Sequence, residues 1–267
     1  MLRPRPSGGS ICHVSHGGDF MLMIGLETSG FVGSIALRRD GQLLEERLLG
    51  QAGRRHAQSL VLELRELLHT HGANSRDVQA IAVSKGPGSF TGLRVGLVCA
   101  KTFAYATGCR FVAVDTFAAI AENCPSDVTD VWVVENAQRG DFFTGRYALD
   151  NSSLTSIRSW RLMAPVQIVA ADEWLASRTA SDTITGPGLT DHMGTISSAR
   201  LLADEAIAKP RAGSIARLGE QRLLSNAMPS IESGVAIDTD FWKAVPFYFR
   251  PSAAEEQHAK RSGVASA

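Results

Sequence analysis

The sequence predicts an α/β protein built from two lobes, each with strands and helices in a βββαβα order. Three observations predict this class. Residues 22–50 alternate and contain the hairpin signal Asp40-Gly41, which indicates three antiparallel strands. Leucines at helical spacing follow and stop at Gly72, and a glycine-rich turn then connects a short apolar run to a second helix. The second half repeats this order more weakly, which suggests duplication.

The first lobe is expected over residues 21–125. Its strands are predicted at residues 22–29, 31–41, 42–50, 78–84 and 110–114, and its helices within residues 54–72 and at 92–107 and 116–123. In the first helix, Leu60, Leu64, Leu67 and Leu68 recur at steps of three and four and form one apolar stripe. Antiparallel strands followed by alternating helices and strands predict a mixed sheet with helices packed on it.

The second lobe is expected over residues 126–251, after a rise in polarity around Pro125 to Asp130. Strands are predicted at 131–135, 141–149, 156–162 and 183–186, and helices near 172–177 and at 212–224. A second Gly-Pro-Gly turn occupies residues 186–188. Residues 1–20 are expected to form a flexible arm, with Met21 as an alternative start to Met1, and residues 252–267 a loose tail.

Composition argues against several classes of function, although it does not exclude direct contact with RNA. Lysine plus arginine and aspartate plus glutamate both total 27, so the chain lacks the basic excess typical of proteins that bind nucleic acid alone. The four cysteines form no close pair, which argues against zinc and favours reduced thiols in a cytoplasm. No apolar run reaches the roughly 18 residues that would indicate a membrane helix, so a cytoplasmic protein with no membrane contact is expected.

The stretch GPGSFTGLRVG, residues 86–96, has two interpretations. A glycine turn that begins a helix can bind an anion through backbone N–H groups and the helix dipole. Alternatively, its glycines form a tight turn or let another segment pack closely. The stretch does not match the GxxxxGK[ST] phosphate motif, and both interpretations stay open. The candidate residues for binding an anion or nucleotide are Thr28, Ser29, Gly86, Gly88, Ser89, Thr91 and Arg94.

A ridge of small residues follows this turn. Gly92, Gly96, Ala100, Ala104 and Gly108 recur at steps of four along one face of the predicted helix. Such a ridge lets another element approach closely, and in soluble proteins it more often packs inside its own fold. Because Leu62 adds apolar surface outside the stripe of the preceding helix, the two helices are also a candidate partner site.

Four motifs carry a family resemblance. Glu27-Thr28-Ser29 follows the first strand, Arg-Arg-His-Ala-Gln at 54–58 opens the first helix, and GPGSFTGLRVG is the most specific motif. Pro-Phe-Tyr-Phe-Arg at 246–250 resembles a P-x-Y-x-R motif. Over residues 21 to about 256, the chain resembles the TsaB (YeaZ) family of tRNA threonylcarbamoyladenosine biosynthesis proteins.

The resemblance implies an actin-like, sugar-kinase-like fold of the ribonuclease H-like group and a non-catalytic role. Members of this family pair with TsaD, which transfers a threonylcarbamoyl group to adenosine 37 of tRNAs that read codons beginning with A. A small ATPase, TsaE, joins them, tRNA is contacted only through the complex, and similar proteins form homodimers. The partner contact uses the first two helices, so the expected interface residues are Leu60, Leu64, Leu67, Gly92, Gly96, Ala100 and Ala104.

The same resemblance implies that transfer chemistry is absent. TsaD-like chains hold a metal through an H-x-x-x-H motif after the strand that follows the ridge helix, and here Thr116 and Ile120 occupy those positions. Isoleucine cannot ligate a metal, so no catalytic residue and no metal site are expected.

Departures from the family pattern bear on nucleotides. Glu27 replaces the usual aspartate, and Asn136 and Gln138 stand where the family often has aspartate and arginine. These changes argue against nucleotide hydrolysis but leave weak binding of ATP or ADP open, with no other cofactor expected. The alternative function is a small-molecule kinase of the same fold, which would use Glu27, Asp115 and Asp141.

Overall fold

The computed structural model describes residues 21–50, 56–150, 158–190, 192, 194, 198–224, 235–237 and 241–247. The expected arm, the expected tail and parts of the 54–58 and 246–250 motifs lie outside the described residues. Among the described residues, twelve helices and strands build the first lobe, and the last three of them come from the C-terminal part of the chain. They are β1 (Leu22–Glu27), β2 (Ser34–Arg39), β3 (Gln42–Leu48), α1 (His56–Thr70), η1 (Ser75–Asp77), β4 (Ala80–Ser84), α2 (Phe90–Thr107), β5 (Arg110–Val114), α3 (Thr116–Glu122), α6 (Ala212–Leu224), β11 (Val235–Ile237) and η4 (Phe241–Lys243).

The first sheet has the strand order β11-β5-β4-β1-β2-β3. β1, β2 and β3 are antiparallel, while β4 pairs parallel to both β1 and β5. Asp40 and Gly41 both have positive φ, 51° and 79°, as a two-residue hairpin with the right twist requires. The predicted hairpin and the five predicted strands of this lobe are confirmed.

The second sheet repeats that arrangement in the order β10-β9-β6-β7-β8. Its elements are β6 (Asp130–Asn136), β7 (Asp141–Leu149), β8 (Trp160–Ala170), α4 (Ala171–Ala176), β9 (Thr183–Thr185), η2 (Pro187–Leu189), β10 (Arg200–Leu202) and α5 (Glu205–Ala208). β6, β7 and β8 form an antiparallel meander, and β9 pairs parallel to β6 and β10. The two lobes therefore share one topology, as the predicted duplication requires, although the helices of the second lobe are much shorter.

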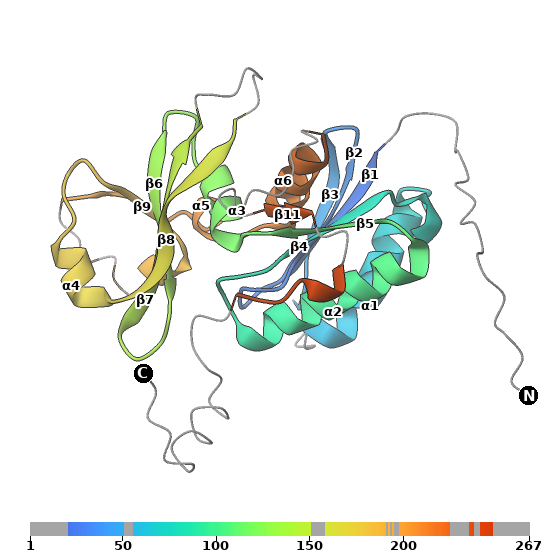
Figure 1. Ribbon diagram of the computed structural model, residues 1–267, viewed down its shortest axis with the longest axis horizontal. Coiled ribbons are helices and arrows are strands. Elements are labelled where there is room, and N and C mark those ends of the chain that lie inside the picture. Colours follow the sequence, from blue (N-terminus) through green and yellow to red (C-terminus); the bar gives the residue numbers. More distant parts are fainter. Residues whose placement is uncertain are drawn as a thin grey trace, which may run out of the picture.

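Helices cover both faces of the first sheet (Figure 1). Along β1, Leu22, Ile24 and Leu26 point into a core formed with α1 and α2, whereas Met23 joins the core formed with α6 and α3. This alternation follows from the two-residue period of a strand. The sheet is thus buried on both sides, and α1 and α2 lie together on the face that is turned away from α6.

The C-terminal part of the chain returns to the first lobe. α6 packs on β1, β2 and β4, and β11 extends the first sheet by pairing antiparallel to β5. The expected division placed residues 126–251 together in the second lobe, and the structure corrects it for α6, β11 and the segment 241–247, which pack on the first lobe. A single core cluster, which contains Met23 and Ile215 as well as Val133 and Tyr147, connects the two lobes. Among the described helices, none is long and apolar enough to cross a membrane.

Candidate functional site

The glycines of the 86–96 stretch let the Thr28-Ser29 turn pack directly on α2. A Cβ atom on Gly92 would lie 1.9 Å from the Thr28 carbonyl oxygen, and one on Gly96 would lie 2.2 Å from Thr28 Oγ1. At Gly88, where φ is +150°, a Cβ would lie 2.6 Å from Ser29 Cβ. Thr28 Oγ1 donates a hydrogen bond to the Gly92 carbonyl oxygen at 2.8 Å. Close packing is therefore confirmed as a role of these glycines.

This packing brings the candidate anion-binding residues together. Several of their polar groups, however, form hydrogen bonds with one another. Ser89 N–H donates to the Ser29 carbonyl oxygen at 2.7 Å, and the Ser89 hydroxyl caps α2 by accepting from Gly92 N–H. Thr28 and Ser29 are buried, whereas Thr91 and Arg94 are exposed. Anion or nucleotide binding at this turn stays a prediction, since several of its polar groups already have partners within the protein.

The positions that would carry metal-binding histidines in a TsaD-like chain serve the fold here. Thr116 Oγ1 accepts a hydrogen bond from Gly86 N–H at 3.1 Å, and Thr116 N–H donates to the Gly86 carbonyl oxygen at 3.0 Å. The Ile120 side chain is fully buried in the core between the lobes. Among the described residues, no group of three or more histidine, cysteine, aspartate or glutamate side chains is placed to hold a metal ion.

Carboxylates gather near the junction of the lobes. Glu27 ends β1, is fully buried, and accepts hydrogen bonds from the backbone N–H and the hydroxyl of Ser29. Burial raises the pKa of Glu27 despite these bonds. Glu135 on β6 is half-buried, and burial together with the nearby charge of Glu27 raises its pKa to about 7. The sequence did not single out Glu135, whose position near Glu27 depends on how the lobes meet.

Asp115 and Lys85 lie at the carboxyl ends of β5 and β4. Asp115 caps α3 by accepting from the N–H groups of Phe117 and Ala118, and it also accepts from the Tyr147 hydroxyl at 3.1 Å. Burial lowers the pKa of the Lys85 amine, and the charge of Asp115 partly offsets that effect. Of the three carboxylates considered for kinase chemistry, Glu27 and Asp115 thus have structural hydrogen bonds, while Asp141 is half-buried at the start of β7.

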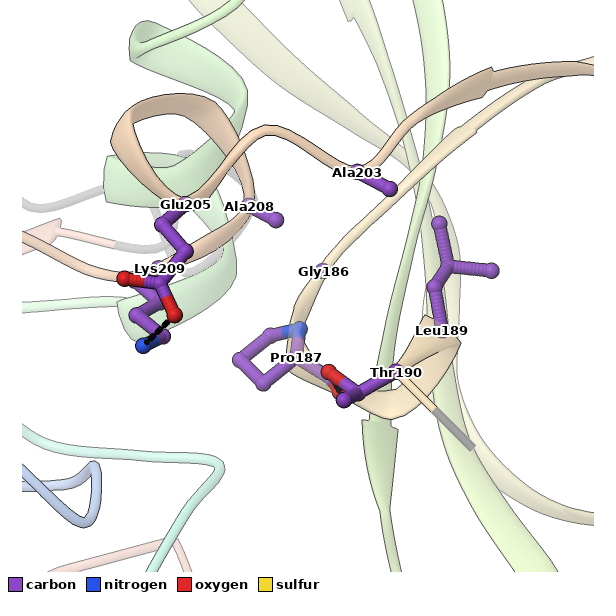
Figure 2. Close-up of a pocket in the computed structure, with 8 residues that line it drawn as sticks. All are labelled: Gly186, Pro187, Leu189, Thr190, Ala203, Glu205, Ala208 and Lys209. Carbon is purple, nitrogen blue, oxygen red and sulfur yellow. Dashed lines mark hydrogen bonds and ion pairs between the residues drawn. The ribbon is translucent and has the colours of Figure 1, made fainter. Parts of the chain in front are cut away.

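A pocket of about 250 Å³ lies between the second Gly-Pro-Gly turn and α5 (Figure 2). The turn packs closely on β6, because a Cβ on Gly186 would lie 2.1 Å from the Val134 carbonyl oxygen. Glu205 and Lys209 form an ion pair at 2.5 Å on the opposite wall. The volume is below the ~300–1,000 Å³ of most small-molecule sites, so the pocket adds little support to a nucleotide-dependent activity.

The expected interface residues all face the interior. Leu60, Leu64 and Leu67 on α1 and Ala100 and Ala104 on α2 belong to the core beneath these helices, with at most 4% of any of them exposed. Gly92 and Gly96 are buried against Thr28, as described above. The ridge of small residues therefore packs on the chain's own β1 and β4, which is the intramolecular alternative that the sequence left open.

A different set of side chains on the same two helices faces outward. Val61 and Leu62 on α1 are 66% and 46% exposed, and Val98 and Tyr105 on α2 are 63% and 72% exposed. Val98 and Tyr105 are seven residues apart, so they lie on one helical face. Leu62 was predicted to be spare apolar surface, but the other three were missed because the core stripe was taken as the contact face. These four residues form what we call the outer helix face.

Comparisons with known proteins find sequence similarity over the part of the chain that contains these helices. The family model described as TsaD, tRNA N6-adenosine threonylcarbamoyltransferase, matches residues 49–181, which include α1, α2 and α3. The TsaB protein of Bacillus subtilis is 28% identical over 155 residues, covering 58% of this chain and 65% of that protein. The TsaB protein of Escherichia coli is 27% identical over 136 residues, covering 50% of this chain and 58% of that protein. The chain thus spans about three-fifths of the length of the curated relatives it matches.

The solved structures agree on the fold. YeaZ from Pseudomonas aeruginosa superimposes with a TM-score of 0.67 at 22% identity, covering 86% of this chain and all of the other. Together with the repeated sheet topology, this likeness shows the fold of the chain, which agrees with the actin-like, ribonuclease H-like fold that the family resemblance implied. The sequence matches and the structural likeness point the same way: over parts of its length the chain is similar to TsaB proteins, and over residues 49–181 it matches the TsaD family model.

Proposed function

We propose that this chain is a non-catalytic subunit for threonylcarbamoylation of adenosine 37 in tRNAs that read ANN codons, and that it binds and activates a TsaD-like transferase. One observation carries the proposal: the region that matches the transferase model keeps the helix pair α1 and α2 but has Thr116 and Ile120 where metal ligands would be needed. Such a chain retains the framework of a transferase without the groups for its chemistry. It contributes to the reaction by contact with a catalytic subunit.

The proposed contact surface is the outer helix face. Val61, Leu62, Val98 and Tyr105 expose apolar area on two helices that touch each other, and exposed apolar side chains on neighbouring helices are candidates for an interaction site. The transferase model covers both helices, so a TsaD-like subunit has a corresponding pair. Two related chains can then pair through the same surface on each, as in a two-fold interface. A TsaE-like ATPase and tRNA join through the resulting complex.

Reconstitution tests the proposed role. The full chain, the TsaD-like subunit of the same cell and its TsaE-like ATPase are mixed with tRNA, and modified adenosine is measured by mass spectrometry. We expect no modification by this chain alone and full modification only when it is present with the transferase. Modification that proceeds equally well without this chain would refute the role. Robust phosphate release from ATP by the chain alone would instead favour the small-molecule kinase.

Interface variants test the proposed surface. Val98→Asp places a charge on the outer helix face without touching the core, and Met163→Asp is a matched control, since Met163 is a similarly exposed residue on β8 of the second lobe. We expect Val98→Asp to weaken transferase binding at least tenfold, about 1.4 kcal/mol, which is a typical hot-spot effect. The control should bind like the parent chain. Equal binding by both variants would exclude this surface, and self-association that survives without transferase binding would favour a homodimer.

A further inference from the structure

The segment 241–247 lies along α2, far in sequence from the helices of the outer helix face. Figure 1 shows its short η4 turn beside α2. Lys101, on α2, donates hydrogen bonds from Nζ to the carbonyl oxygens of Trp242 and Ala244 at 3.1 and 2.5 Å. At the far end of the segment, Phe247 N–H donates to the Lys85 carbonyl oxygen at 2.8 Å. The segment is thus attached at one end to the middle of α2 and at the other to the end of β4.

The Lys85 side chain strengthens the second attachment. Its amine lies 4.4 Å from the centre of the Phe247 ring, a distance at which a cation is attracted to an aromatic face. The Phe247 backbone also lies against Gly86, where a Cβ would be 3.3 Å from the Phe247 carbonyl oxygen. Most of these contacts involve backbone groups of the segment 241–247. They therefore hold its backbone in place without burying its side chains.

The side chains of this segment remain largely outside the core. Trp242 is 60% exposed and its ring lies 5.8 Å, centre to centre, from the ring of Tyr105. Val245 is 66% exposed. Tyr105 already belongs to the outer helix face, so Trp242 continues that apolar surface beyond the helix. A tryptophan held in place but left exposed is the residue type that most often dominates a protein–protein interface.

Charge distinguishes between the candidate occupants of this surface. Neither α2 nor the segment 241–247 contains an acidic residue, whereas Arg94, Lys101 and Lys243 are basic. Glu63 and Glu66 lie on α1, so this basic character belongs to α2 and the segment rather than to the whole outer helix face. A second copy that paired through α2 and the segment would bring like charges toward one another, which disfavours self-pairing there. A partner with an apolar helix surface and acidic side chains at its rim fits better. The segment also lies outside residues 49–181, the part of the chain that the transferase model matches.

We propose that the segment 241–247 is a third element of the docking surface, that Trp242 contacts the TsaD-like subunit, and that Lys101 is a positioning residue that holds Trp242 in place. This inference rests on the proposed function, since it assigns new residues to the same partner. The segment and α2 form one surface. The affinity for the transferase therefore depends on a lysine that itself makes no contact with the partner.

A double-mutant cycle tests the inference. Binding of the full-length chain to the TsaD-like subunit is measured by isothermal titration calorimetry for Trp242→Ala, Lys101→Met and the double variant. We expect Trp242→Ala to weaken binding about tenfold and Lys101→Met about threefold. Because Lys101 acts through Trp242, the double variant should bind no more weakly than Trp242→Ala alone. Lys101→Arg, which can still donate to both carbonyl oxygens, should bind close to the parent chain.

Two controls separate the inference from the proposed function. Lys209→Met removes an exposed lysine of the second lobe and should leave the affinity unchanged. Val98→Asp reports on the outer helix face itself. If Val98→Asp abolishes binding while Trp242→Ala and Lys101→Met bind normally, the segment is not part of the surface and the proposed function stands. If all three bind normally, the surface is elsewhere, so both surface assignments fail while the proposed function stands; a parent chain that does not bind the transferase would overturn the proposed function. Additive losses in the double variant would show that Lys101 does not act through Trp242.

Discussion

Replacing Gly92 by alanine should destabilise this protein strongly, although alanine is the better helix former. The added Cβ would lie 1.9 Å from the carbonyl oxygen of Thr28, and a backbone atom cannot rotate away as the end of a side chain can. Contact at an ordinary 3.4 Å or more requires α2 and the Thr28 turn to separate by more than an ångström. That movement would also stretch the buried hydrogen bond from Thr28 Oγ1 to Gly92, which is 2.8 Å long.

The magnitude follows from three contributions. Overpacking of a close-packed interior costs about 1–3 kcal/mol or more, and a lost buried hydrogen bond costs roughly 1 kcal/mol. The higher helix propensity of alanine returns at most about 1 kcal/mol. The free energy of unfolding should therefore fall by about 1–3 kcal/mol, which for a chain of this size corresponds to a decrease in Tm of roughly 2–12 °C.

Urea denaturation followed by circular dichroism measures this change, and Gly213→Ala is the matched control. Gly213 is also in the first turn of a helix, but the nearest atoms to its added Cβ are the flexible Leu43 methyl groups at 3.4 and 3.5 Å. The control should be neutral or slightly stabilising. A Gly92→Ala variant within about 0.5 kcal/mol of the parent, the usual range for a surface substitution, would refute the claim that glycine is needed for close packing here.

Three further predictions follow from burial and charge. Ala100→Arg should abolish folding because that position is fully buried, whereas Val98→Arg two residues earlier should leave the far-ultraviolet spectrum and Tm nearly unchanged. Glu135, with its pKa raised to about 7, binds protons more tightly when folded, so it should make stability fall as pH rises from about 4.5 to 7, and urea titrations of Glu135→Gln should show a shallower slope. Glu220→Ala leaves Arg38 without its buried ion-pair partner and should lower the free energy of unfolding, measured by urea denaturation, by about 3–5 kcal/mol.

The regular elements of the first lobe could be predicted because local signals there agree with the tertiary structure. Asp40-Gly41 fixes the hairpin, and Gly72, with φ of +65°, follows the end of α1. β8 was predicted at 156–162 but runs from Trp160 to Ala170 and contains Pro165. Proline usually argues against a strand, yet β8 is at the edge of its sheet, where a missing donor is tolerated. Periodicity alone does not distinguish an edge strand from a central one.

The short late elements were missed for a different reason. β10 and β11 have three residues each and α5 has four, too few to show a period. β11 forms by pairing with β5, which would otherwise be the edge strand of the first sheet. β5 is more than a hundred residues earlier in the sequence, so local sequence around β11 could not indicate this pairing. This pairing places β11 with the first lobe, which no local composition change indicated.

The small-residue ridge illustrates how far a pattern can locate a contact. A four-residue repeat of glycine and alanine establishes that something approaches one face of α2 closely, but it does not identify what approaches. The approaching group is the Thr28 turn together with β4, so the inner face of α2 is restricted to small residues by the chain's own backbone. Only the exposed side chains of α2, on the outer helix face, can then vary in size and charge to suit a partner. For the proposed transferase contact, specificity must consequently come from larger exposed side chains such as Val98 and Tyr105, and substitutions that alter partner choice without unfolding should map to that face.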